Sequence, residues 1–195
     1  MGATAYSANP IVSGYPDFIM SGETRKRVDT HFRVWLQIAR VFDDPNLSEI
    51  EKCIYAINLS GIEHTDTLAD IAGIQKFLAA EPDSSKHRVR KGPRTFDYDV
   101  DYGRIVASFQ SDYGIDITDR ECSMHWWRFV DLLRNLSNAT ALMRAIEIRT
   151  MPLPEGRDEH SSKRREAVIA AKRELALPSK GLEEMAAKDR ALWGE

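Results

Sequence analysis

The stretch TDRECSMHWWRFVDLLRNL, residues 118–136, decides the fold that the sequence predicts. Its large apolar side chains recur at intervals of three and four residues, which places them on one face of an α-helix. Thr118 has a side chain suited to the N-cap of this helix. The apolar face would consist of Cys122, Trp126, Phe129, Leu133 and Leu136, widened by Trp127 and Val130.

The same spacing recurs in other segments, for which we predict helices over about 24–42, 48–60, 65–80, 97–113 and 138–150. Ser48 followed by Glu51 has the form of a capping box, and Gly114 is a natural C-terminal stop. No segment shows a convincing alternation of apolar and polar residues. The predicted fold is therefore all-α, a compact domain of about six helices.

The predicted helices also define which apolar residues should face the core. On the segment 48–60 the expected stripe is Ile50, Cys53, Ile54 and Ile57. On the segment 65–80 the residues expected to face inward are Leu68, Ile71, Ile74, Phe77 and Leu78.

Changes in composition divide the chain into three predicted parts: an irregular arm (1–22), a helical core (23–154) and a charged helical tail (155–195). A last helical piece is expected over about 179–193. We expect the tail to order on a client protein or on sister copies. Its candidate apolar anchors are Val168, Ile169, Leu175, Leu182, Met185 and Leu192.

Composition indicates a water-soluble protein. The 195 residues are 43% hydrophobic and carry a formal net charge of -3, which gives no general attraction to nucleic acid. The chain has no apolar run long enough to cross a membrane and no secretory signal pattern, so a cytoplasmic location is expected. Cys53 and Cys122 lack the spacing of a metal site and are expected to be free thiols.

Several patterns were weighed as chemical sites. The acidic run Asp97, Asp99 and Asp101 suggests a calcium loop, but Tyr102 and Ser108 stand where that loop needs glycine and glutamate. The five histidines include no pair spaced by three or four residues, and no local motif of common enzyme classes is present. We therefore predict no catalytic, cofactor-binding or metal-binding residues and no enzymatic activity.

Three features allow more than one interpretation. The aromatic residues of the segment 126–129 have helical spacing, which favours packing in the core over a groove for a partner. We interpret His125 as a partly buried structural histidine in preference to a catalytic base paired with Asp116 or Asp119. In the tail, the basic residues 163–165 and 172–173 are interspersed with acids, which makes a solvated face more favourable than nucleic-acid binding.

An ordered set of motifs resembles the bacteriophage gene-product-fifteen family. It comprises FDYDVD (96–101), ASF (107–109), YGIDIT (113–118), HWWRF (125–129), LL (132–133), Leu136 and IR (148–149). The best-matching region is about residues 96–151, and the predicted helices over 24–80 agree with the family more in pattern than in identity. The tail after Pro154 lies outside the resemblance. It marks the following as core or partner-binding candidates: Tyr113, Gly114, Asp116, His125, Trp126, Trp127, Arg128, Phe129 and Arg149.

The resemblance implies a protein of long-tailed phages (siphoviruses) or prophages. Its expected role is that of a tail-assembly chaperone that keeps the tape measure protein soluble in the bacterial cytoplasm. The expected partners are the tape measure protein and other tail components, with a homo-oligomer as a further possibility. The alternatives are a structural or tail-completion component of the virion, an uncharacterised enzyme using His125, and a nucleic-acid-binding protein.

Overall fold

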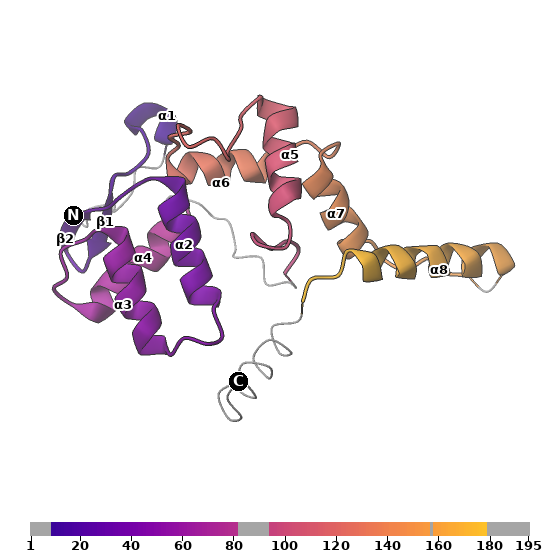
Figure 1. Ribbon diagram of the computed structural model, residues 1–195, viewed down its shortest axis with the longest axis horizontal. Helices are drawn as coiled ribbons and strands as arrows, with labels where there is room; N and C mark the ends of the chain where they lie inside the picture. The colour runs from indigo at the N-terminus through magenta and orange to yellow at the C-terminus, as the bar shows by residue number, and fades with distance from the viewer. Residues whose placement is uncertain (1–8, 82–93, 157, 179–195) are drawn as a thin grey trace. The chain divides into compact units, whose positions relative to one another are not determined.

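The computed structural model describes residues 9–81, 94–156 and 158–178 (Figure 1). These residues form mostly helices and one two-stranded antiparallel sheet. The elements are α1 (Pro10–Ser13), β1 (Phe18–Ser21), β2 (Thr24–Arg27), α2 (Phe32–Asp43), α3 (Glu49–Ser60), α4 (Thr67–Leu78), α5 (Tyr102–Tyr113), α6 (Trp126–Arg134), α7 (Ala141–Thr150) and α8 (Glu159–Glu174). The mostly helical character is confirmed. A pure all-α fold and a count of six helices are wrong, because the described residues hold eight helices and a hairpin.

The described residues divide into two compact units. The first unit comprises residues 9–81 and 123–131, and it contains α1 to α4, the hairpin and the first part of α6. The second comprises residues 94–122, 132–156 and 158–178, and it contains α5, α7 and α8. The chain crosses between the units within α6.

The hairpin occupies a segment predicted partly as an irregular arm and partly as the start of a helix. Phe18 pairs with Arg27 and Ser21 with Thr24, and the turn between them uses Gly22 at a φ of 60°. Strand β1 packs closely on α4 at Gly73, where an added Cβ would collide with the carbonyl oxygen of Met20. A glycine in the middle of α4 thus permits the contact between strand and helix.

A buried ion pair fixes the hairpin to the start of α4. The Lys26 ammonium lies 2.6 Å from an Asp70 carboxylate oxygen and also donates to the carbonyl oxygen of Glu63 at 2.9 Å. The second Asp70 oxygen lies 2.9 Å from Nδ1 of His64 and accepts from the backbone N–H of Thr65 at 3.2 Å. Burial alone would raise the pKa of Asp70, but the hydrogen bonds from Lys26 and its neighbours hold it well below its usual value.

Helix ends agree with the sequence where the signal is local. The capping box of Ser48 and Glu51 is present, and α3 ends before Gly61 in the left-handed conformation. Helix α5 ends before Gly114, whose φ of 65° is left-handed. The predicted ends are therefore confirmed. They could be predicted because each depends on a few neighbouring residues.

The predicted helix over 118–136 is wrong at its start, since α6 begins only at Trp126. Asp116 accepts hydrogen bonds from the backbone N–H and hydroxyl of Thr118, at 2.8 and 2.6 Å, and Asp119 accepts from the N–H of Glu121 at 3.0 Å. Such short-range side-chain bonds compete with helical backbone bonds. Cys122 therefore precedes the helix. The separate helix predicted over 179–193 lies outside the described residues.

Two expected inward stripes also differ from the structure. Helix α3 buries Ala56, Ile57 and Ser60, while Ile50 and Ile54 are exposed. On α4, Ile74 and Phe77 are buried as expected, but Leu68 is exposed. The buried residues of α3 all lie in its second half, whereas Ile50 and Ile54 lie in its first half.

Replacing Lys26 with alanine should destabilise the first unit, because Asp70 would keep a buried negative charge without its ammonium partner. We expect the free energy of unfolding to fall by about 3–5 kcal/mol. Chemical denaturation followed by the fluorescence of the buried tryptophans measures this change. Arg27→Ala is the matched control, since its ion pair with Asp17 is exposed and should contribute less than about 1 kcal/mol. Equal losses in the two variants would contradict the role given to Lys26.

Candidate functional site

The HWW segment starts α6 beside the start of α2. His31 and His125 form an isolated antiparallel bridge, in which the N–H of Phe32 donates to the carbonyl oxygen of Met124 at 2.9 Å. The N–H of Trp126 donates in turn to the carbonyl oxygen of Thr30 at 2.7 Å. Two helices thus begin side by side, each preceded by a histidine.

Both ring nitrogens of His125 are engaged by backbone groups. Nδ1 accepts from the N–H of Trp127 at 3.0 Å, and Nε2 lies 3.0 Å from the carbonyl oxygen of Pro16. A carbonyl can only accept, so Nε2 carries the proton and the ring is neutral. Burial lowers the pKa of His125 below its usual value, and the ring of Tyr15 stacks on it at 5.1 Å. This environment is typical of a structural histidine that caps a helix.

The aromatic side chains after His125 are covered within the first unit. Trp126, Trp127 and Phe129 are each no more than 2% exposed. The indole N–H of Trp126 donates to the carbonyl oxygen of Leu78 at 3.0 Å, and that of Trp127 to the carbonyl oxygen of Phe77 at 3.1 Å. These carbonyls belong to the last two residues of α4. The indoles therefore hold the end of α4 and offer no surface to a partner, whereas Arg128 is exposed.

Other residues of the motif set support the second unit. The hydroxyl of Tyr113 donates to the carbonyl oxygen of Leu132 at 2.9 Å, and burial raises its pKa. Gly114 supplies the left-handed residue that ends α5, and Asp116 caps the turn at Thr118. Each of these residues has a local structural contact.

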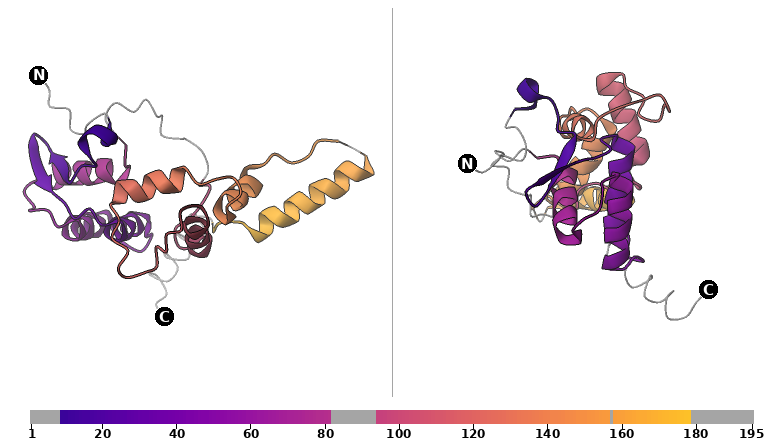
Figure 2. Two further views of the ribbon diagram at one scale, coloured as in Figure 1. Left: turned by 90° about the horizontal axis from the view of Figure 1, so that it is seen from above. Right: turned by 90° about the vertical axis from the view of Figure 1, so that its left-hand side faces the viewer.

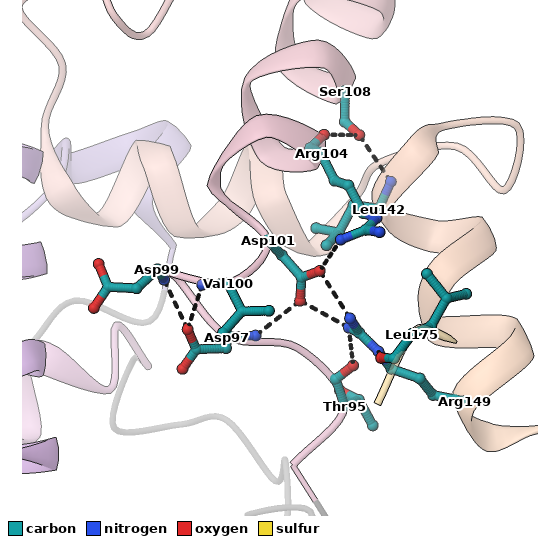
Figure 3. Close-up of polar contacts among 10 residues, drawn as sticks. All are labelled: Thr95, Asp97, Asp99, Val100, Asp101, Arg104, Ser108, Leu142, Arg149 and Leu175. Carbon is teal, nitrogen blue, oxygen red and sulfur yellow. Dashed lines mark hydrogen bonds and ion pairs between the residues drawn. The ribbon is translucent and has the colours of Figure 1, made fainter. Parts of the chain in front are cut away.

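Arg149 joins four parts of the second unit, as Figure 3 shows. Its guanidinium binds both oxygens of the fully buried Asp101 side chain, at 2.7 and 2.8 Å. It also donates to the carbonyl oxygens of Thr95 at 3.0 Å and of Leu175 at 2.6 Å. One side chain on α7 thus contacts the start of α5, the segment before it and the residue after α8.

Asp101 receives a second arginine. Nη1 of Arg104 lies 2.9 Å from one of its oxygens, and the N–H of Asp97 donates to the other at 3.1 Å. Burial alone would raise the pKa of Asp101, but the hydrogen bonds from Arg149 and its neighbours keep it below its usual value. Asp101 is therefore a buried carboxylate held ionised by its partners.

In the acidic run 97–101, which was compared with a calcium loop, the Asp97 side chain binds neighbouring groups of the chain. One oxygen of Asp97 accepts from the N–H groups of Asp99 and Val100, at 2.8 and 2.7 Å, and the other lies 2.6 Å from Arg94. Within the described ranges, no group of three or more histidine, cysteine, aspartate or glutamate side chains is placed to hold a metal ion.

Polar contacts join helix α8 to the end of α7 and to the segment that follows α7. After α7 the chain makes a long loop, and α8 then runs back toward α7 (Figure 2). Arg165 donates to the carbonyl oxygen of Pro154 at 3.0 and 3.1 Å, and Lys172 to that of Arg149 at 3.1 Å. No residue of α8 is buried, and the candidate anchors Val168, Ile169 and Leu175 are half-buried. The other candidate anchors, Leu182, Met185 and Leu192, lie outside the described residues.

One exposed apolar surface was missed by the sequence reasoning. Ile50, Ile54 and Tyr55 of α3 are 73, 52 and 47% exposed. We call these three residues the α3 face. Ile50 and Ile54 are spaced by four residues, so their side chains lie next to each other on the helix. Their spacing indicated an apolar row, but only the structure shows that this row is turned to solvent.

Comparison with known protein families shows which family the chain belongs to. The family described as bacteriophage Gp15 protein matches residues 17–177. The chain belongs to this family. Neither a curated protein nor a solved structure matches the chain.

The family match is longer than the motifs alone indicated. It includes the hairpin, α2 to α4 and also α8, so the expectation that the segment after Pro154 lies outside the resemblance is wrong up to residue 177. The chain is thus a phage protein in which both described units belong to the family pattern. Of its described helices, none is both long and apolar enough for a membrane span.

His125→Asn should flatten the pH dependence of stability. The folded-state pKa of His125 is lowered, so the unfolded chain takes up the proton first as the pH falls through about 6.5, and stability is lost in that range. Asparagine also caps helices but does not titrate. Thermal unfolding of both proteins at pH values between about 7.5 and 5.5 tests this prediction, because the two chains differ only at position 125. An unchanged pH dependence in the variant would contradict it.

Arg149→Ala should destabilise the second unit, because Asp101 loses its bidentate partner and α8 loses its contact at Leu175. We expect a loss of about 3–5 kcal/mol, with faster hydrogen exchange in α5, α7 and α8. Exchange measured by mass spectrometry separates this unit from the first. Arg104→Ala is the control, since this partly exposed arginine makes one of the Asp101 contacts and should cost less. If both variants exchange alike, Arg149 is not the main link.

Proposed function

We propose that this phage protein is a tail-assembly chaperone that binds the tape measure protein and keeps it soluble during tail assembly in the host cytoplasm. Membership of the Gp15 family supports a role in a phage. The observation that carries the finer proposal is the α3 face, where three large apolar side chains remain exposed on a helix that is otherwise well packed.

The physical reasoning concerns the client. A tape measure protein is a long, largely helical chain, and it exposes apolar stripes until the tail tube surrounds it. A helix that presents Ile50 and Ile54 to solvent can lie against such a stripe and keep it from aggregating. Binding without turnover would be sufficient for this activity.

The second candidate is a structural or tail-completion component of the virion. The charged helix α8 favours it, because a helix with no buried residue can form part of an interface in an assembly. Mass spectrometry of purified particles distinguishes the two roles, since a chaperone should be absent from the finished particle and a component should be present in stoichiometric amount.

Co-expression with the tape measure protein of the same phage tests the proposal. We expect the tape measure protein to move from the insoluble to the soluble fraction and to elute with this protein in size-exclusion chromatography. The reason is that the α3 face would cover apolar stripes that otherwise associate. A tape measure protein that stays equally insoluble with and without this protein would refute the chaperone role.

A further inference from the structure

The segment that contains the α3 face is rich in acidic residues. From the C-cap of α2 at Asp44 to the N-cap of α4 at Asp66, the chain holds five acidic residues and one lysine, which gives 1 - 5 = -4 with His64 neutral. The acidic residues are Asp44, Glu49, Glu51, Glu63 and Asp66. The whole chain has a net charge of only -3. The segment that contains α3 is therefore acidic.

Two of these acidic residues, Glu49 and Glu51, lie beside Ile50 on the first turn of α3. Glu51 and Tyr55 form a row spaced by four residues next to the row of Ile50 and Ile54. Glu51 is exposed, with its carboxylate directed to the N-cap, and the Glu49 side chain is 88% exposed. Lys52 lies 2.9 Å from Glu49 and offsets only one of the charges.

We propose that the α3 face binds an amphipathic helix of the client whose apolar row, spaced by three and four residues, is bordered by lysine or arginine. This inference rests on the proposed function and adds the chemistry of the partner. The apolar row contacts Ile50, Ile54 and Tyr55, and the basic border is attracted by the acidic residues around them. An acidic client helix, anionic lipid and nucleic acid are repelled by the same charges.

A second copy of this chain fits the face less well. Helix α8 is basic, with five lysine or arginine residues against three glutamates. Its larger apolar residues Val168 and Ile169, however, are already partly covered in the structure. A helix from another protein can present its whole apolar row, which makes it the better occupant.

Binding of two designed peptides to the full chain tests the proposal. Both peptides form amphipathic helices with the same leucine row, bordered by lysine in one and by glutamate in the other. Fluorescence anisotropy should show at least about tenfold tighter binding of the lysine peptide, since 1.4 kcal/mol corresponds to a factor of ten. Raising the salt concentration should weaken this binding because the charges are exposed. Equal affinity for the two peptides would overturn the proposed partner chemistry.

Variants locate the site. Ile50→Ser with Ile54→Ser should weaken binding of the lysine peptide about tenfold or more, corresponding to the loss of two apolar contacts. Tyr102→Ser is the matched control, because Tyr102 is 70% exposed but belongs to the second unit. Circular dichroism verifies that both variants are folded. Unchanged binding by the double variant, or equal loss in the control, would overturn the site.

Two further measurements separate this inference from the proposed function and from self-association. If the wild-type protein solubilises the tape measure protein and the double variant does so equally well, the chaperone role stands and the α3 site is wrong. If the wild-type protein binds the lysine peptide but fails to solubilise the tape measure protein, the proposed function fails on its own. Sedimentation of the wild-type protein as a dimer that the double variant dissociates would show a second copy on the face and overturn the proposal.

Discussion

The ends of short helices impose the main constraint on this structure. Helices α2 to α5 have twelve residues each and α6 has nine, so much of their backbone lies within four residues of an end, where helical hydrogen bonds are missing. Side chains supply these bonds at N-termini, through His31, Ser48, Asp66, Thr140 and Asp158, among others. At the other ends, the two indoles after His125 bind the last carbonyls of α4, and Lys172 and Arg149 bind carbonyls near the ends of α7 and α8. Several residues that stand out in the sequence are thus those that complete helix ends.

This constraint explains how much of the fold could be predicted. The ends of α3 and the end of α5 follow from local signals, namely the Ser48 capping box and the glycines after each helix. The hairpin could not be recognised, because its strands have four residues each and the burial of Lys26 depends on Asp70, which lies 44 residues further along the chain. Helix α6 starts late because the side chains of Asp116 and Asp119 bind backbone N–H groups that a helix would otherwise use. The spacing of apolar residues does not show which of these hydrogen bonds forms.

The candidate site shows the same division between local and distant information. Apolar spacing identified α3 as a helix, but which of its residues are buried depends on the elements that pack against it. The aromatic segment allowed two interpretations, and the position of its indoles against the end of α4 favours core packing. The aromatic residues that stand out in the sequence are therefore covered, whereas Ile50, Ile54 and Leu68, which were expected to face the core, are exposed.

The small size of the α3 face is consistent with a transient interaction. Three partly exposed side chains bury far less area than the roughly 1,200–2,000 Å² of a stable interface. The proposed chaperone role requires release of the client when assembly proceeds, and a small apolar contact reinforced by charge suits that requirement better than a large one. The acidic surroundings also supply selectivity, because exposed apolar side chains alone would accept any apolar surface, whereas a negative border repels acidic clients. On this reasoning the apolar row gives the contact its strength, and the charge determines which helices receive it.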